Sequence, residues 1–145
     1  LAAAMFNLEH RVRIFVFQVL DRRVEYLLLR QRPREEWPLG PVVGPVNAGE
    51  KLEEAIRREV HAEIGLRRPI HLLELAAPQR EVYGDLGLVE WPYAWQAGTP
   101  SEPVGPLRPG PMVGEVHWLG FEAAYHQLEN PADREALVRL QLALQ

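Results

Sequence analysis

A helix enclosed between a turn and a glycine is the feature that most constrains how this chain can fold. Segment 51–64 contains neither proline nor glycine, and Gly65 follows it directly. An apolar side chain recurs at every fourth position of the segment: Leu52, Ile56, Val60 and Ile64. That period predicts a helix with one apolar stripe facing a core. Gly65 suits the left-handed conformation in which many helices end.

Two carboxylates share one face of this predicted helix. Glu59 and Glu63 are four residues apart, which stacks their side chains one above the other. At about 100° per residue they fall at the edge of the apolar stripe, between core and solvent. Like charges so placed cost stability, and a hard divalent cation compensates them well. The alternative is an ordinary solvated helix face, since glutamate is a good helix former.

The surrounding segment 44–66 (GPVNAGEKLEEAIRREVHAEIGL) resembles the Nudix box, whose pattern is G-x5-E-x7-R-E-U-x-E-E-x-G-U with U a bulky aliphatic residue. Ala62 stands where the pattern has the first glutamate of its Glu-Glu pair. The spacing is otherwise intact, which makes the match more specific than a lone glycine-rich loop. The matching residues are Gly44, Glu50, Arg58, Glu59, Val60, Glu63, Gly65 and Leu66.

This resemblance implies a Mg2+-dependent hydrolase that cleaves a phosphoanhydride bond in a nucleoside diphosphate linked to another group. A nucleoside triphosphate pyrophosphohydrolase is the first guess. By the same resemblance, Glu59, Glu63 and the backbone carbonyl of Val43 are the metal ligands, and Mn2+ is an alternative ion. Arg58 would pair with Glu50 and lock the loop to the helix, with Gly44 and Gly65 as further structural positions. An ordinary surface ion pair is the alternative for Arg58 and Glu50.

Ala62 motivates a second hypothesis. A methyl group there removes one negative charge beside the cation, so we expect weaker metal binding or fewer bound ions. A Nudix-fold module that binds nucleotides or regulates, without turnover, is the alternative function. The family often places another glutamate where this chain has Met112, and we take Glu115 as the substitute catalytic group. Other candidates for that role are Glu81, Asp85 and Glu90.

Arg30, Arg32 and Trp37 precede the box and resemble the family's strand–arginine–aromatic lead-in. We expect them to bind substrate, because arginine pairs with phosphate and an aromatic ring stacks on a nucleobase. The alternative is that the arginines merely end a strand and that the aromatic ring covers the core. Other candidates for base stacking are Tyr83, Trp91, Tyr93 and Trp95.

The rest of the chain mixes strands with helices and indicates an α+β fold. The resemblance sharpens this to a Nudix-type αβα sandwich with a central mixed β-sheet between helices. Segment 37–44 reads as a loop, and 98–114, with five prolines, as a loop that is either a substrate lid or a rigid connector. The predicted strands are 13–17, 24–29, 70–76, 79–85, 87–95 and 115–118, and the later helices are 121–128 and the segment after Asn130.

Length and composition limit the remaining possibilities. A chain of 145 residues predicts one domain, at 10–145, after an N-terminal extension at 1–9 that we expect to be partly disordered. A net charge of −4 argues against a nucleic-acid partner, and no apolar run reaches the roughly 20 residues of a membrane helix. We therefore expect a cytoplasmic protein that binds a small nucleotide-type diphosphate, with a homodimer left open.

Overall fold

The computed structural model describes residues 7–33 and 36–145. Seven strands form one mixed sheet in the order β4-β6-β1-β2-β7, with β3 beside β1 and β5 beside β6. The strands are β1 (Asn7–Val19), β2 (Val24–Gln31), β3 (Val42–Pro45), β4 (His71–Glu74), β5 (Gln79–Tyr83), β6 (Leu86–Gly98) and β7 (Val113–Leu119). The helices are α1 (Leu52–Ile64), α2 (Phe121–Gln127) and α3 (Pro131–Ala143).

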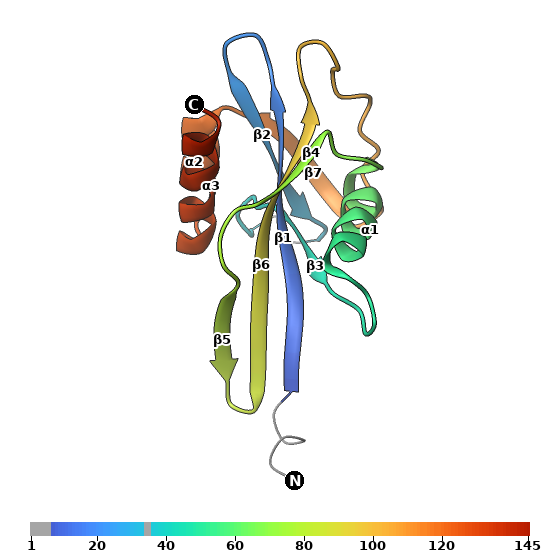
Figure 1. The fold of residues 1–145 in the computed structure, drawn as a ribbon, viewed down its shortest axis with the longest axis vertical. Coiled ribbons are helices and arrows are strands. Elements are labelled where there is room, and N and C mark those ends of the chain that lie inside the picture. Colours follow the sequence, from blue (N-terminus) through green and yellow to red (C-terminus); the bar gives the residue numbers. More distant parts are fainter. Residues whose placement is uncertain (1–6, 34–35) are drawn as a thin grey trace.

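The helices cover the sheet from both sides, which confirms the predicted α+β sandwich. Helix α1 lies on one face, and α2 and α3 lie on the other (Figure 1). Side chains of β1 alternate between the two cores. Val12, Ile14 and Val16 pack in the cluster beneath α1, whereas Phe15 and Phe17 pack in the cluster beneath α2 and α3. Because β1 is hydrogen-bonded to β6, β2 and β3, it forms the centre of the sheet.

The predicted loop 37–44 needs correction, and the predicted boundary at residue 9 lies within a strand. Segment 37–44 is not wholly a loop, because Val42 begins strand β3, which pairs with β1 through Val42↔Ile14 and Gly44↔Val12. The N-terminal boundary at residue 9 falls inside β1, which starts at Asn7 and pairs there with Leu86. Residues 7–9 are therefore part of the sheet. The other part of the expected extension, residues 1–6, lies outside the described residues.

Helix α1 begins and ends as its sequence predicts. The Glu54 carboxylate accepts a hydrogen bond of 3.1 Å from the backbone N–H of Lys51, before the first turn. Gly65 has a φ of 80°, and its N–H donates to the carbonyl of His61. The apolar stripe is buried through Ile56, Val60 and Ile64. These contacts fix the axis of the helix, and with it the direction of the side chains at its edge.

The proline-rich segment 98–114 docks on the C-terminal end of α1. The N–H of Arg108 donates to the carbonyl of Ile64 at 2.8 Å, and the N–H of Gly110 donates to that of Glu63 at 3.0 Å. Carbonyls in the last turn of a helix lack partners within the helix, so the segment supplies the donors that α1 needs. It is thus fastened to the helix that carries the two candidate metal ligands.

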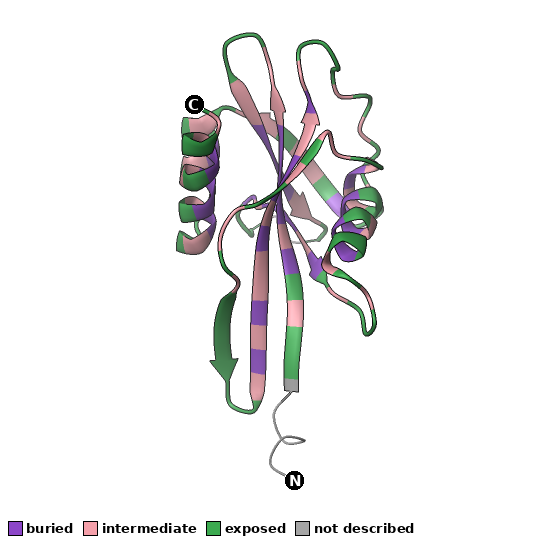
Figure 2. Ribbon diagram, in the orientation of Figure 1, coloured by how far each residue is buried: buried purple, intermediate pink, exposed green. Residues whose placement is uncertain are grey.

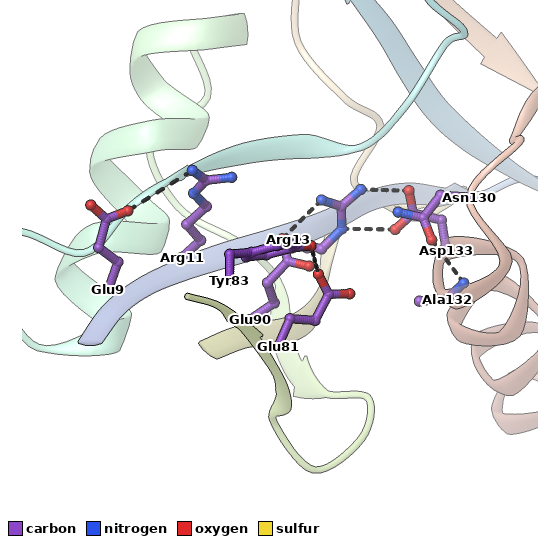
Figure 3. Close-up of polar contacts among 9 residues, drawn as sticks. All are labelled: Glu9, Arg11, Arg13, Glu81, Tyr83, Glu90, Asn130, Ala132 and Asp133. Atoms are coloured by element: carbon purple, nitrogen blue, oxygen red, sulfur yellow. Dashed lines mark hydrogen bonds and ion pairs between the residues drawn. The ribbon is translucent and has the colours of Figure 1, made fainter. Parts of the chain in front are cut away.

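A half-buried ion triad holds α3 against the sheet (Figure 3). The Arg13 guanidinium reaches across from β1 to Asp133 in the first turn of α3, with donor–acceptor distances of 2.8 and 2.5 Å. It also donates to Glu90 of β6 at 3.1 Å. Asp133 is 4% exposed. One cation therefore links the centre of the sheet to the last helix.

The lower halves of β1 and β6, together with β5, extend beyond the helices as a three-stranded arm (Figure 1). Every residue of β5 is exposed (Figure 2). Within the described residues, β5 pairs with β6 and with no other strand, so its outer edge is free. No helix in the described part of the chain is long and apolar enough to cross a membrane.

Candidate active site

The Glu59 carboxylate lies against the backbone of Gly44, where β3 passes beneath α1. Glu59 is only 8% exposed. A Cβ added to Gly44 would lie 2.0 Å from Glu59 Cδ, so the Glu59 carboxylate would have to move away from its observed place. The absence of a side chain at Gly44 is therefore what lets a charged helix residue approach the sheet. Both members of this contact are positions that the sequence analysis singled out.

Arg58 fastens the loop before α1 to the helix. Its Nε and Nη2 donate to the two oxygens of Glu50 at 2.8 and 2.9 Å, and Nη2 also donates to the Pro45 carbonyl at 2.7 Å. Its Nη1 donates to Glu59 at 2.7 Å. Hydrogen bonding from Arg58, followed by the Asn47 N–H, lowers the pKa of Glu50 to about 2. The bidentate pair and the third contact give Arg58 the locking geometry that the box implies.

Glu63 is half-buried one turn further along α1, where Gln31 at the end of β2 donates to its carboxylate at 3.3 Å. Burial, followed by the negative charge of Glu59, raises the pKa of Glu63. The negative charges of the two carboxylates therefore repel each other.

This donor set suits a magnesium ion. Two carboxylates one turn apart are hard oxygen ligands, and their repulsion is what a cation would relieve. In the described residues no group of three His, Asp or Glu side chains is placed to hold a metal. With alanine at position 62, the candidate carboxylate ligands on this helix are Glu59 and Glu63. Val43 lies in β3, immediately before Gly44, and its carbonyl is the predicted third oxygen.

Arg30 is bound by two partners at the far end of β2. Its Nη1 pairs with the Glu115 carboxylate, and its Nε donates to the Trp37 carbonyl at 2.7 Å. Glu115 also hydrogen-bonds His117 Nε2 at 3.1 Å. The His117 hydrogen bond and the charge of Arg30 lower the pKa of Glu115. Glu115 is thus held ionised by two neighbours and orients Arg30.

The structure does not bring Glu115 to the carboxylates on α1. Val116 and Trp118 of β7 pack against the core beneath α1. Because side chains alternate along a strand, Glu115 and His117 point to the opposite face of the sheet.

The other candidates for the catalytic group are also elsewhere. Glu90 is bound by Arg13, and Glu81 is hydrogen-bonded to Tyr83 on the arm. Asp85 lies in the turn after β5.

A cavity of about 350 Å³ is lined by two of the three predicted substrate-binding residues. Its walls include Arg30, Trp37 and Val43, together with Gln31 and Arg13. A neighbouring cavity of about 170 Å³ is lined by Arg30, Gln31 and Arg32, with Gly114 and Glu115. Arg32 is exposed and donates to the Val113 carbonyl at 3.1 Å. Trp37 is 51% exposed. The structure thus groups Arg30, Arg32 and Trp37 around Gln31, which also contacts Glu63.

Sequence reasoning missed Gln31 and Arg13. The available signal was alternation: Gln31 is in phase with Leu27 and Leu29, so a polar side chain continues a stripe that faces α1. The other aromatic candidates lie apart from this cavity. Trp95 is fully buried, and Trp91 donates to His10 at 3.1 Å.

Comparison with known proteins agrees with the fold. The NUDIX domain family model matches residues 9–140. A Listeria monocytogenes protein of the NUDIX hydrolase type is 18% identical, with a TM-score of 0.77 and 93% of each chain covered. The NUDIX domain of Shewanella oneidensis NrtR, in complex with ADP ribose, is 14% identical, with a TM-score of 0.76 and coverage of 99% of this chain and 92% of that one.

A Caenorhabditis elegans Ap4A hydrolase in a binary complex is 16% identical, with a TM-score of 0.72 and coverage of 94% of this chain and 97% of that one. No match was found among curated proteins. At these identities the solved structures show a shared fold. The family model spans nearly the whole described chain, and the chain therefore belongs to the Nudix family.

Proposed function

We propose that this protein hydrolyses a phosphoanhydride bond in a nucleoside diphosphate linked to another group, with Mg2+ bound at Glu59 and Glu63. One observation carries the proposal: Glu59 is seated against Gly44, one turn before Glu63 on the same helix, and Arg58 and Glu50 lock the loop beside them. Two carboxylates in mutual repulsion form a site that a divalent cation stabilises.

The metal, when bound, would polarise the phosphate and lower the pKa of the attacking water. Glu59, Glu63 and the Val43 carbonyl would hold it, and Mn2+ would serve in place of Mg2+. Arg58 holds Glu59 by a hydrogen bond of 2.7 Å, so the orientation of this ligand is set before a metal arrives.

The cavity beside these residues suits a polyphosphate attached to a flat group. Arg30 and Arg32 would bind phosphate oxygens, and Trp37 offers an exposed ring for stacking. A nucleoside triphosphate is our first candidate. Two structural neighbours support the wider class, because one is an Ap4A hydrolase and one was solved with ADP ribose. Glu115 supports Arg30 in this proposal, because its carboxylate is bound by Arg30 and hydrogen-bonded to His117.

A second candidate function is nucleotide binding without turnover. It is favoured by Ala62 and by the two-carboxylate site, since a further acidic ligand would strengthen metal binding. In that case the protein would recognise a nucleotide-type diphosphate through the same cavity and release it unchanged.

One experiment separates the two candidates. Nucleoside triphosphates, Ap4A and ADP ribose are incubated with the protein and Mg2+ or Mn2+, and the products are quantified by chromatography. For the hydrolase, we expect Glu63→Gln to lower kcat/KM at least about tenfold. Glu53→Gln is the matched control, because Glu53 is an exposed glutamate on the same helix. Binding without products supports the second candidate, and turnover that survives Glu63→Gln contradicts the proposed metal site.

A further inference from the structure

Residues from outside α1 bind Glu63 at both its side chain and its backbone. At its side chain, Gln31 Nε2 donates to the carboxylate at 3.3 Å. At its backbone, the N–H of Gly110 donates to the carbonyl at 3.0 Å. These two residues come from the end of β2 and from the proline-rich segment. Both the backbone and the carboxylate of Glu63 are therefore fixed by residues from outside α1.

The two supports of Glu63 are themselves connected. The Val113 N–H donates to the Gly110 carbonyl at 3.1 Å. Arg32, the residue after Gln31, donates from its N–H to the Met112 carbonyl at 2.7 Å and from its Nε to the Val113 carbonyl at 3.1 Å. The contacts form a closed ring that runs from Glu63 through the loop to β2 and back to the Glu63 carboxylate.

We propose that Gln31 is a positioning residue for Glu63, and that the loop segment Gly110–Val113 holds Gln31 and Glu63 against each other. The inference rests on the proposed function, in which Glu63 is a metal ligand. Gln31 itself is assigned the role of a hydrogen-bond donor to that ligand.

The two carboxylates are bound by different kinds of donor, and this difference explains why position 31 carries an amide side chain. Glu59 is bound by the cation Arg58, which neutralises part of its charge. Glu63 is bound by a neutral donor, which orients the carboxylate and leaves its negative charge available for a metal. Because position 62 is alanine, the negative charge of Glu63 contributes a larger share of the attraction for a cation. A cationic donor in place of Gln31 would compete with the ion.

Gly110 is required for the close approach of the loop. A Cβ at this position would lie 2.2 Å from the Ala62 carbonyl oxygen, so any other residue has to push the loop off the helix. Gly105 lies in the same loop, and a Cβ there meets nothing within 4 Å in the described part of the chain. The loop thus contains one glycine that the contact needs and one that it does not.

The first test measures Mn2+ affinity by calorimetry or electron paramagnetic resonance, without substrate. Gln31→Met keeps the length of the side chain and removes the donor. We expect it to raise the Kd for Mn2+ about tenfold, as is typical when a partner of a metal ligand is lost. Gln18→Met is the matched control. Gln18 also donates to a glutamate, Glu25, at 3.1 Å, but at the other end of the β1–β2 hairpin. Its Kd should stay within about twofold of wild type.

The second test uses the loop. Gly110→Ala should weaken Mn2+ binding at least about threefold, whereas Gly105→Ala should not change it. If the ring acts as one unit, Gln31→Met combined with Gly110→Ala should raise the Kd by less than the product of the two single effects. Thermal unfolding of each variant, followed by circular dichroism, verifies that the fold persists at the titration temperature.

The outcomes distinguish a failure of this inference from a failure of the proposed function. If the wild type does not bind Mn2+, or if Glu63→Gln leaves its Kd unchanged, the proposed metal site is wrong and the inference is overturned with it. If Glu63→Gln weakens binding and Gln31→Met does not, the metal site stands and the inference alone is overturned. Equal effects of Gln31→Met and Gln18→Met also overturn it.

Discussion

At the scale of single residues, the contact between Gly44 and Glu59 is the most demanding feature of the site. A methyl group at Gly44 would lie 2.0 Å from Glu59 Cδ. We expect Gly44→Ala to displace the Glu59 carboxylate, and to lower the free energy of unfolding by about 1 kcal/mol, the lower end of the usual cost of overpacking, because only the far end of a flexible side chain has to move. Urea unfolding measures the change. Gly40→Ala is the control, because a Cβ there meets nothing within 4 Å among the described residues. Equal losses in the two variants would contradict the steric argument.

Glu50 gives the protein a defined response to acid. Its pKa is lowered from 4.5 to about 2 in the fold, chiefly by hydrogen bonding from Arg58. A depressed carboxyl pKa stabilises the folded state above the unfolded pKa, and this stabilisation disappears as pH falls from about 4.5 to about 2. We expect Glu50→Gln to be less stable than wild type at pH 7 and to lose less stability across that window. Urea unfolding at a series of pH values checks this, and parallel curves would contradict it.

Local spacing predicts part of this site and cannot predict the rest. Glu59, Glu63 and the Arg58–Glu50 pair lie on one helix and in the loop just before it. Their contacts with one another therefore follow from their spacing in the sequence. Gln31 is 32 residues from Glu63 in sequence and meets it only because the sheet brings β2 beneath α1. Glu115 shows the opposite case. Its place in the sequence suited a catalytic group, but strand alternation turns it to the other face of the sheet.

At the scale of elements, α3 depends on a charge pair with the centre of the sheet. Asp133 is 4% exposed and binds Arg13 through two contacts (Figure 3). Removing one partner leaves a buried charge poorly compensated, so Asp133→Ala should lower the free energy of unfolding by about 3 kcal/mol. The control is Glu135→Ala on the same helix. Its exposed pair with Arg139 is worth about 0.5 kcal/mol. Similar losses in urea unfolding for both variants would contradict the assignment.

The elements themselves follow sequence pattern wherever the pattern is long. The period-four stripe predicts the start of α1 to within one residue, and Gly65 marks its end. Strand β3 was missed because its four residues contain a glycine and a proline, and so they show no alternation. Its strand character comes from pairing with β1, which is tertiary information. The fastening of segment 98–114 to α1 has the same origin, since backbone hydrogen bonds leave no mark in side-chain composition.

At the scale of the whole molecule, the arm and the body should differ in local stability. Each residue of β5 is exposed, whereas β1 is fully buried from Ile14 to Phe17 (Figure 2). Few buried contacts oppose local opening in β5, so its amide hydrogens should exchange at least about tenfold faster than those of 14–17. Hydrogen–deuterium exchange with mass spectrometry measures this difference. Equal protection in the two strands would indicate that the arm is covered in solution.

The end of strand β2 divides the candidate site between the two faces of the sheet, which bears on the shape of the molecules that the site can accept. Gln31 points toward the face of the sheet that carries α1, and its neighbour Arg30 points toward the face that carries α2 and α3. A molecule that touches both side chains must lie across the rim of the sheet, where the two side chains line the same cavities. Elongated, bendable compounds meet this demand better than compact ones do.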